Sequence, residues 1–538
     1  MTAGQHGREG GHEGHLLNRC RRLAECGDAG VIRVAPAAPK AGRQRWMMDE
    51  KLATSLQLPM ATVKTGEVRE GAVGSLVAVF STLQDEKGHR YYGLGWYAPA
   101  ASEHTLDLST AHAVDATAVE AALRSSRAAP ASPGPSGAAV CVGMPEFLPS
   151  MLQRGTYGGC EPMGPFFSMR PVPGSRFGLR YAHVNVERAV VVRLAAFHVR
   201  RCQLQDGSEG VRLDRFAATT VERWYFDAAR CSRQEIEADN GVRGTLFVPH
   251  EARMRPAVGV IDMFGTAGGV LEFRASLYAS HGFVALALPY FGYKDLPTSM
   301  GDLNLDYFDT AVQWMCSLPE VNDNIGIGLS GVSLGGELVL RIATVCPKVK
   351  AVAAISPSNL NTCMGFTYKG KVIPAVNLDF HLTEMEDAPE QVYYAPRKDG
   401  EPHRIYDFRP TWTRHKSTPV HDDVAKSLTP VEKMQCSLLL VAGMDDEDWP
   451  GGQFSNSVYQ RLMHHGYKYP VVHRSYPGTG HLIEPPYAPF CSYSYHKLVQ
   501  GSMRWGGVAE LHNAAQEQSW KLIIDLFANA LTAPAAKM

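Results

Sequence analysis

Continuous apolar segments alternate with helix-forming segments from residue 241 onward in this 538-residue chain, and this rhythm constrains the fold more than any other feature. A strand buried on both faces reads as an unbroken apolar run, whereas a half-buried strand alternates apolar and polar residues. The rhythm therefore predicts an α/β domain whose mainly parallel sheet is covered by helices on both faces. We expect strands within residues 241–249, 257–265, 283–292, 324–331, 350–358, 437–443 and 469–476, and helices within residues 269–282 and 305–319.

The preceding half of the chain has a different pattern, with many short strands and few helices. Residues 75–99 read as two strands joined by the turn Asp85-Glu86-Lys87-Gly88, in which the glycine can supply a positive φ. Further strands are expected within residues 188–202 and 218–226. This series of short strands predicts an all-β domain, an immunoglobulin-like sandwich.

A chain of this length exceeds the size at which one hydrophobic core keeps growing, so two domains are expected. Residues 125–138 are rich in Pro, Ser, Gly and Ala, which predicts a flexible loop. We divide the chain into a disordered N-terminal extension (1–60), a β-sandwich (61–240) with a flexible loop near 125–152, an α/β domain (241–531) and a short tail (532–538).

The charge balance and the cysteines exclude several classes of protein. The chain has 53 basic and 54 acidic residues, and a net charge of -1 does not suggest a nucleic-acid-binding surface. The 11 cysteines form no Cys-x-x-Cys pair, and an odd number fits reduced, intracellular thiols better than a secreted disulfide framework. No apolar run approaches the roughly 18 residues of a membrane-spanning helix, and no signal-peptide pattern is present. Acidic residues argue against a mitochondrial transit peptide: Glu9, Glu13, Glu25 and Asp28.

The stretch Gly331-Val332-Ser333-Leu334-Gly335 is the candidate for catalytic chemistry. It matches Gly-x-Ser-x-Gly, the nucleophile elbow of α/β-hydrolases, and it lies between a predicted strand and a predicted helix, as that motif requires. The glycines leave room for a tight turn that raises the serine hydroxyl above the edge of the sheet. We therefore expect an α/β-hydrolase domain with Ser333 as the nucleophile.

A serine nucleophile needs a histidine base and an acid, and in this fold they follow it in the order Ser, Asp, His. The acid is expected in the loop after the strand 437–443, where Asp446 is favoured over its neighbour Asp445 and over Asp448. Asp446 lies three residues beyond the glycine that ends the strand, a spacing common in this fold.

His481 is the candidate base, because it lies on a loop between the predicted last strand and the C-terminal helix. His464, His465 and His473 fall in helix or strand patterns that suit catalysis less well. The developing oxyanion needs amide donors. We nominate the amide of Leu334 and, from the Gly-rich loop after the strand 257–265, that of either Thr266 or Ala267.

Several stretches together resemble the family of type I acyl-CoA thioesterases and bile acid-CoA:amino acid N-acyltransferases. They include "DMFGTAGGVLEFRASLYASHGF", "GVSLGGELVL", "GMDDEDW", "YPGTGHLIEPPYAPFC" and "RWGG" in the α/β half, and "GCEPMGPFFSMRP" in the β-rich half. The resemblance covers about residues 60 to 530 and departs from the family in the N-terminal extension, at 125–152 and near 395–425.

The resemblance implies an acyl-CoA thioester as substrate, no cofactor beyond the CoA of the substrate, and triad positions at Ser333, Asp446 and His481. The N-acyltransferase branch carries cysteine at the nucleophile, so serine indicates hydrolysis. Two alternatives remain: conjugation of glycine or taurine by an N-acyltransferase, and an acyl-CoA-binding protein without activity. The end of the chain, Ala536-Lys537-Met538, is a relaxed form of the Ser-Lys-Leu signal and predicts a peroxisomal import receptor as partner, with a cytoplasmic location as the alternative.

Overall fold

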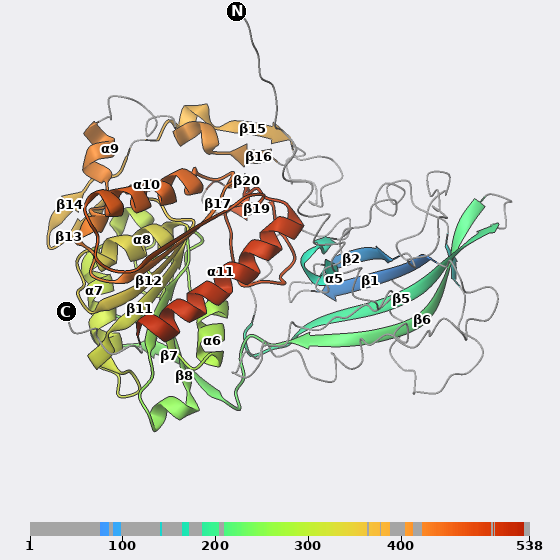
Figure 1. Ribbon diagram of the computed structural model, residues 1–538, viewed down its shortest axis with the longest axis horizontal. Helices are drawn as coiled ribbons and strands as arrows, with labels where there is room; N and C mark the ends of the chain where they lie inside the picture. The colour runs from blue at the N-terminus through green and yellow to red at the C-terminus, as the bar shows by residue number, and fades with distance from the viewer. Residues whose placement is uncertain are drawn as a thin grey trace, which may run out of the picture.

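The structure is a computed structural model of the whole chain (Figure 1). It describes the residues of the following ranges: 76–84, 90–97, 140–142, 164–171, 185–203, 209–362, 365–376, 378–387, 404–412, 422–496, 499 and 501–531. The predicted N-terminal extension, the turn at residues 85–88, the loop predicted near 125–152 (except 140–142) and the C-terminal tail therefore lie outside the described residues.

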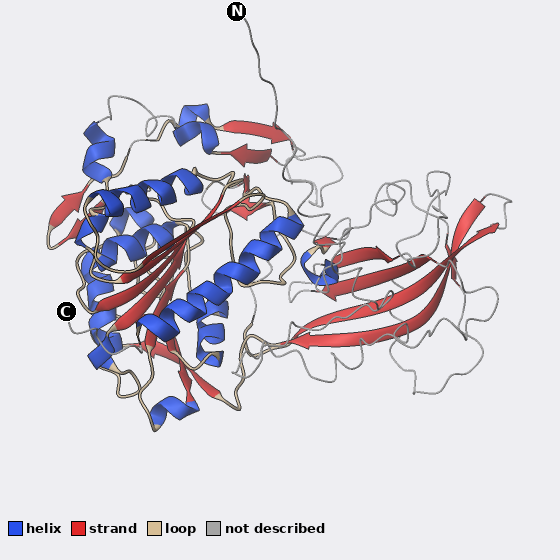
Figure 2. Ribbon diagram, in the orientation of Figure 1, coloured by secondary structure: helices blue, strands red, loops and turns tan. Residues whose placement is uncertain are grey.

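A six-stranded sheet forms the described part of the N-terminal half, with its strands in the order β3-β6-β5-β1-β2-β4. All of its strand pairs are antiparallel, and the long pair β5 and β6 runs along its length (Figure 2). The predicted hairpin before residue 99 is present as β1 and β2. The strands are β1 Leu76–Gln84, β2 Arg90–Tyr97, β3 Val140–Val142, β4 Arg170–Pro171, β5 Val190–Gln203 and β6 Glu209–Arg223, with the short helix α5 Gly164–Phe167 beside them.

An eight-stranded sheet forms the centre of the C-terminal half, in the order β18-β17-β12-β11-β9-β10-β8-β7. The six strands from β18 to β10 are parallel, and β8 and β7 continue the sheet in antiparallel pairs. This arrangement confirms the predicted α/β-hydrolase fold. The strands are β7 Cys231–Glu237, β8 Arg243–Pro249, β9 Gly259–Met263, β10 Val284–Ala287, β11 Ile327–Val332, β12 Val349–Ile355, β17 Ser437–Gly443 and β18 Val471–Tyr476.

Helices cover both faces of this sheet (Figure 1). Alternate residues of β12 point to opposite faces: Val352 belongs to the core under α7, α8 and α10, and Ala353 to the core under α6 and α11. Two buried faces explain the unbroken apolar strands of the sequence. The helices are α6 Phe273–Ser280, α7 Leu305–Cys316, α8 Leu334–Ala343, α10 Gly451–His464 and α11 Ala509–Ala530.

The first strand of the large sheet, β7, lies before the predicted domain boundary at residues 240 and 241. It pairs with β8 along its whole length, so the predicted boundary falls between two strands of one sheet. As an edge strand, β7 is only partly buried, and its mixed polar sequence resembles the N-terminal strands more than the buried ones. The eight-stranded sheet therefore begins with β7, whereas the apolar strand pattern of the sequence begins only with the next strand, β8.

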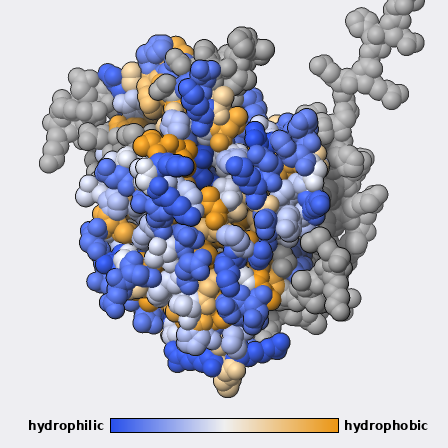
Figure 3. Space-filling view, turned by 90° about the vertical axis from the view of Figure 1, so that its left-hand side faces the viewer, coloured by the Kyte–Doolittle hydropathy of each residue, from blue (hydrophilic) through white to orange (hydrophobic). Residues whose placement is uncertain are grey.

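Smaller elements lie on the remaining connections. The four-stranded sheet β15-β16-β20-β19 combines segments before and after the last strand of the large sheet, and β13 and β14 form a hairpin. These elements are β13 Phe366–Tyr368, β14 Lys371–Ile373, β15 Glu384–Asp387, β16 Arg404–Asp407, β19 Tyr493–His496, β20 Gly501–Arg504 and helix α9 Asp422–Ser427. The face of the molecule in Figure 3 is mostly hydrophilic, and its apolar residues lie in small separate groups.

The two halves of the chain contact each other through the segment that follows the candidate base. Arg223 at the end of β6 donates to the carbonyl oxygens of Pro486 and Tyr487. The amide of Phe490 donates to the carbonyl of Phe167, at 2.8 Å. The N-terminal half therefore supports the loop that carries His481.

Candidate active site

The turn between β11 and α8 carries Ser333 at the carboxyl edge of the large sheet. Ser333 has φ 61° and ψ −127°, a strained conformation for a residue with a side chain. A Cβ atom on Gly331 would lie 2.1 Å from the carbonyl oxygen of Gly335, and one on Gly335 would lie 2.5 Å from that of Phe264. Both glycines are therefore required by close backbone packing, and the strand-turn-helix context of the motif is present.

Neighbouring backbone holds Ser333 in place. Its amide donates to the carbonyl oxygen of Ile355 at 3.0 Å, at the end of the adjacent strand β12. Helix α8 begins at the next residue, Leu334, and the positive end of a helix dipole favours negative charge beside it. The start of this helix would therefore stabilise negative charge on the Ser333 oxygen or on an oxyanion beside it.

Asp446 is the acid that contacts the candidate base. Its Oδ2 atom lies 2.8 Å from His481 Nδ1, and its Oδ1 atom accepts the amides of Asp448 and Trp449 at 3.0 and 3.1 Å. Asp445 is exposed, and its carboxylate accepts the amide of Gly478 instead. Of the two adjacent acids, the structure therefore places Asp446 beside the imidazole.

His481 is fully buried between two indole rings. Trp449 packs edge-on at 5.2 Å between ring centroids, and Trp505 stacks at 5.8 Å. The backbone of His481 is held on both sides, because its amide donates to the carbonyl of Trp505 at 2.7 Å and its own carbonyl accepts the Ser356 hydroxyl at 2.6 Å. Burial alone would lower the pKa of His481, but the carboxylates of Asp446 and Asp448 raise it above the ordinary value.

The second ring nitrogen of His481 faces a different carboxylate. Asp448 Oδ2 lies 3.3 Å from His481 Nε2, and this nitrogen has no hydrogen-bond partner within the described part of the chain. The structure thus brings Asp446 and His481 together but does not join Ser333 to His481 by a hydrogen bond. Catalytic hydrogen bonds are often long or misaligned before substrate binds.

The predicted oxyanion loop packs directly against Ser333. A Cβ atom on Gly265 would lie 2.9 Å from Ser333 Cβ, so the loop backbone and the serine are in contact. Among the described residues, no hydrogen bond uses the amide of Leu334, Thr266 or Ala267 as its donor. Within the described chain, these three amides are therefore not committed to another acceptor.

Side chains from two other segments contact this loop. Tyr290 donates its hydroxyl to the carbonyl oxygens of Phe264 and Gly265, at 2.6 and 3.0 Å. The hydroxyl of Thr266 lies 3.0 Å from Nε2 of His496, whose pKa burial lowers to about 4, so this imidazole is neutral. The loop is therefore rigidly positioned.

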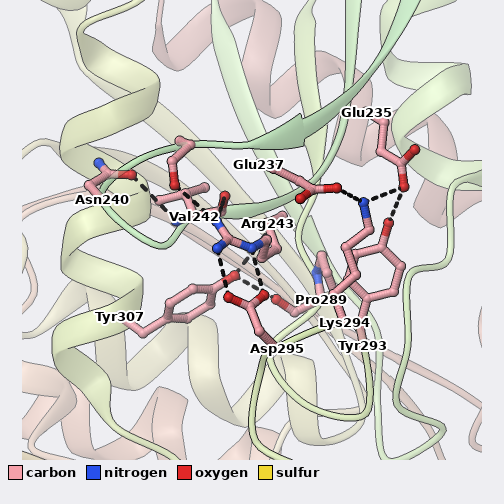
Figure 4. Close-up of polar contacts among 11 residues, drawn as sticks. Glu235, Glu237, Asn240, Val242, Arg243, Pro289, Tyr293, Lys294, Asp295 and Tyr307 are labelled. Carbon is pink, nitrogen blue, oxygen red and sulfur yellow. Dashed lines mark hydrogen bonds and ion pairs between the residues drawn. The ribbon is translucent and has the colours of Figure 1, made fainter.

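The segment that carries Tyr290 is itself tied to the edge of the large sheet (Figure 4). Arg243 on β8 makes a two-pronged ion pair with Asp295, with both distances at 2.7 Å. Lys294 contacts Glu235 and Glu237 of β7. The part of this segment that follows Tyr290 is thus anchored to β7 and β8, while Tyr290 itself contacts the predicted oxyanion loop.

A buried ionic cluster joins the oxyanion loop to the histidine loop. Arg274 on α6 pairs with Asp262 at 3.1 Å and with Glu484 at 3.5 Å, and it donates to the carbonyl of Met263 at 2.7 Å. Burial raises the pKa of Glu484 to about 7, although Arg274 opposes the rise. The guanidinium therefore connects the residues before Phe264 to the residues after His481.

Sequence reasoning from the residues alone missed several of these supporting groups. Gly506 forms an isolated bridge with Asp446, and Gly507 forms one with Thr479, so the "RWGG" stretch holds the acid loop and the histidine loop together. A Cβ atom on Gly506 would lie 2.0 Å from the carbonyl oxygen of Asp445. In the sequence, only the family resemblance of the "RWGG" stretch indicated that Gly506 and Gly507 belong near the site.

The predicted alternatives for the base have other surroundings. His473 lies on β18 and stacks on Tyr459, and His464 and His465 lie at the C-terminal end of α10. Among the described residues there is no group of three or more His, Cys, Asp or Glu side chains that could hold a metal ion.

Comparison with known proteins shows the family. The family described as BAAT / Acyl-CoA thioester hydrolase C terminal matches residues 303–533, and the Acyl-CoA thioester hydrolase/BAAT N-terminal region matches residues 150–238. Human acyl-coenzyme A thioesterase 1 is 35% identical over 69% of this chain and 80% of its own length. The chain belongs to the acyl-CoA thioester hydrolase/BAAT family. This confirms the resemblance found in the sequence.

The names of two further members of the acyl-CoA thioester hydrolase/BAAT family state a cellular location. Human acyl-coenzyme A thioesterase 2, mitochondrial, is 34% identical over 69% of this chain and 70% of its own length. The mouse peroxisomal succinyl-coenzyme A thioesterase is 35% identical over 70% of this chain and 81% of its own length. Within the described residues, no helix is both long and apolar enough to cross a membrane.

Proposed function

We propose that this protein is an acyl-CoA thioesterase that hydrolyses acyl-CoA to a free acid and CoA. The observation that carries the proposal is the arrangement at the sheet edge: Ser333 in a strained turn, with the hydrogen-bonded pair of His481 and Asp446 on neighbouring loops. The names of the relatives support a thioester substrate. The fold and family are compatible with hydrolysis.

The proposed reaction has two steps. His481 takes the proton of the Ser333 hydroxyl, whose oxygen attacks the thioester carbonyl, and CoA leaves as a thiol. Asp446 holds the imidazole by Nδ1, so that Nε2 is the basic nitrogen. Water, activated by the same histidine, then hydrolyses the acyl-serine ester and releases the acid.

The amides near Ser333 are proposed to stabilise the tetrahedral intermediates. The amide of Leu334 begins helix α8, and the amides of Thr266 and Ala267 lie on the loop that packs against the serine. Preorganised donors of this kind typically contribute about two to three orders of magnitude in rate each. CoA enters only as part of the substrate, and no separate cofactor is proposed.

The test is to identify the product as well as to measure the rate. Purified protein is incubated with acyl-CoAs of several chain lengths, including succinyl-CoA, with and without glycine or taurine. We expect free acid and free CoA in all cases, and the panel reveals which acyl groups are accepted. A mainly N-acylated product would instead support the amino acid N-acyltransferase alternative.

The alternative of a non-catalytic acyl-CoA-binding protein makes a different prediction. A fluorophosphonate probe should label an activated serine, and we expect it to label Ser333. Absence of both labelling and turnover would favour a binding protein. The complete set of Ser333, Asp446 and His481 argues for an enzyme.

A peroxisomal location is also proposed, from Ala536-Lys537-Met538 and from the name of the mouse relative. These three residues lie outside the described residues. Imaging an N-terminally tagged protein with and without them tests the import signal. A diffuse distribution that is the same for both forms would contradict it.

A further inference from the structure

The imidazole of His481 has a carboxylate at each of its two nitrogens. Asp446 Oδ2 lies 2.8 Å from Nδ1, and Asp448 Oδ2 lies 3.3 Å from Nε2. The mechanism proposed above uses Asp446 and leaves Asp448 without a role. Nε2 is the nitrogen that must accept the Ser333 proton, so a carboxylate beside it bears directly on catalysis.

The backbone of Asp448 is fixed at both ends. Its amide donates to Asp446 Oδ1 at 3.0 Å, and its carbonyl accepts the indole N–H of Trp412 at 3.2 Å. Its side chain is only 15% exposed, and the imidazole is fully buried. Water can therefore screen the contact between Asp448 and Nε2 only weakly.

The charges around this contact are carboxylates. Among the described residues, Asp446, Asp448 and Glu484 act on His481, and Glu484 is also paired with Arg274. Asp448 is also faced by Asp407 on β16, which is paired with Arg409. Burial raises the pKa of Asp448 to about 6 against the opposing effect of His481, while the nearby carboxylates raise the pKa of His481 despite its burial. The contact between Asp448 Oδ2 and His481 Nε2 therefore favours the charged forms of both groups, a carboxylate and an imidazolium.

The charge state of the ring decides whether Asp448 attracts or repels Nε2. In the imidazolium, Nε2 carries a proton that Asp448 attracts. In the neutral ring protonated at Nδ1, Nε2 presents a lone pair to the same carboxylate, which is unfavourable. Loss of the Nε2 proton to solvent therefore releases the ring from Asp448.

We propose that Asp448 is a positioning residue that holds the His481 imidazolium through Nε2 in the substrate-free enzyme, and that it thereby sets the pH above which His481 can accept the Ser333 proton. This inference rests on the proposed function, because it assigns Asp448 a role in the regulation of the same site. Asp446 orients the imidazole of His481, whereas Asp448 raises the pH at which that imidazole loses its Nε2 proton.

The test compares Asp448→Asn, which keeps the shape and removes the charge, with a matched control. Glu447→Gln removes the carboxylate of the preceding residue, which pairs with Arg409 and Arg504, both at 3.6 Å. We expect the acid limb of kcat/KM for an acyl-CoA to move to lower pH by about one unit in Asp448→Asn, because a nearby opposite charge typically raises a histidine pKa by one to three units. The limb should not move in Glu447→Gln, and the charge-conserving variant Asp448→Glu should return it toward the wild-type position.

A second measurement does not depend on turnover. NMR titration of protein with labelled histidines should show His481 deprotonating at lower pH in Asp448→Asn than in wild type. The inference is overturned if His481 titrates at the same pH in both proteins, or if Asp448→Asn lowers the rate by the same factor at every pH. Absence of acyl-CoA hydrolysis by the wild type would contradict the proposed function, while the NMR titration would still decide the role of Asp448.

Discussion

Ser356 donates its hydroxyl to the carbonyl oxygen of His481 at 2.6 Å. The residue before it, Ile355, is the last residue of strand β12, and its carbonyl oxygen accepts the amide of Ser333. Two consecutive residues of one strand end therefore hold the candidate nucleophile and the candidate base. The relative position of Ser333 and His481 depends on this short connection.

Ser356→Ala should lower kcat/KM because it removes the hydrogen bond that fixes the histidine loop. We expect a loss of about tenfold, equivalent to about 1.4 kcal/mol, which is the usual cost of leaving one buried acceptor without its partner. Ser358→Ala is the matched control, since that buried hydroxyl accepts the amide of Leu360 and does not contact His481. An equal loss of activity in both variants, measured by steady-state kinetics, would contradict this role for Ser356.

Asp446→Asn should abolish most activity, whereas Asp445→Asn should have little effect. The first change favours the wrong tautomer of His481, an effect that can reach about four orders of magnitude in kcat in a Ser-His-Asp triad. The second affects an exposed side chain, and asparagine can still accept the amide of Gly478. Kinetics of the two purified variants, with circular dichroism to check folding, provide the measurement. A larger loss of activity in Asp445→Asn than in Asp446→Asn would show that Asp446 is not the acid of the triad.

Gly265→Ala should impair chemistry more than binding. The new methyl group would lie 2.9 Å from Ser333 Cβ and 3.1 Å from its Oγ, so the oxyanion loop must move away from the serine. We expect kcat to fall by about a hundredfold, the effect of losing one oxyanion donor. Gly365→Ala is a suitable control because its added methyl group makes only ordinary contacts, at 3.5 Å. A normal kcat for Gly265→Ala would argue against this loop as the oxyanion hole.

Glu484→Gln should change how stability depends on pH. Burial raises the pKa of Glu484 from an ordinary 4.5 to about 7, so the folded state binds this proton more tightly than the unfolded state does. The wild type therefore loses stability as the pH rises from about 4.5 to about 7, on the order of 3 kcal/mol from this group, and glutamine removes that loss. Denaturation midpoints of the two proteins at pH 5 and pH 7.5 provide the comparison.

Glu432→Gln is the control for this pH effect. Arg461 lowers the pKa of Glu432, so its contribution is present above the unfolded pKa and is lost only as the pH falls through the lowered folded value. The difference between wild type and Glu432→Gln should stay nearly constant over the upper part of the window. A constant difference for Glu484→Gln as well would show that Glu484 titrates normally.

The fold was largely predictable because its signals are local. The sheet strands are unbroken apolar runs, and Gly-x-Ser-x-Gly marks the turn after β11 without any long-range information. The structure adds the reason for that motif, since Gly331 and Gly335 each lie against backbone atoms. The edge strand β7 lies on the N-terminal side of the predicted boundary, because it is only partly buried and lacks the apolar run that marks the other strands of the sheet.

The surroundings of the site could not be predicted in the same way. Asp445 and Asp446 are adjacent, and only the tertiary structure determines that Asp446 turns toward His481 while Asp445 turns toward Gly478. Trp505, which comes directly after strand β20, stacks on His481 from 24 residues further along the chain, so no local pattern relates the two. The contact between Asp448 and Nε2 of His481 likewise cannot be derived from the spacing of the two residues in the sequence.

The central claim is that Ser333 carries the acyl group during turnover. Intact-protein mass spectrometry of wild type and Ser333→Ala, quenched within the first turnovers on a reactive acyl-CoA, measures this directly, and peptide mapping locates the adduct. We predict an acyl adduct on Ser333 in the wild type, together with free acid and CoA, and neither adduct nor turnover in Ser333→Ala. Normal turnover by Ser333→Ala, or an acyl group attached to a different residue, would contradict the account.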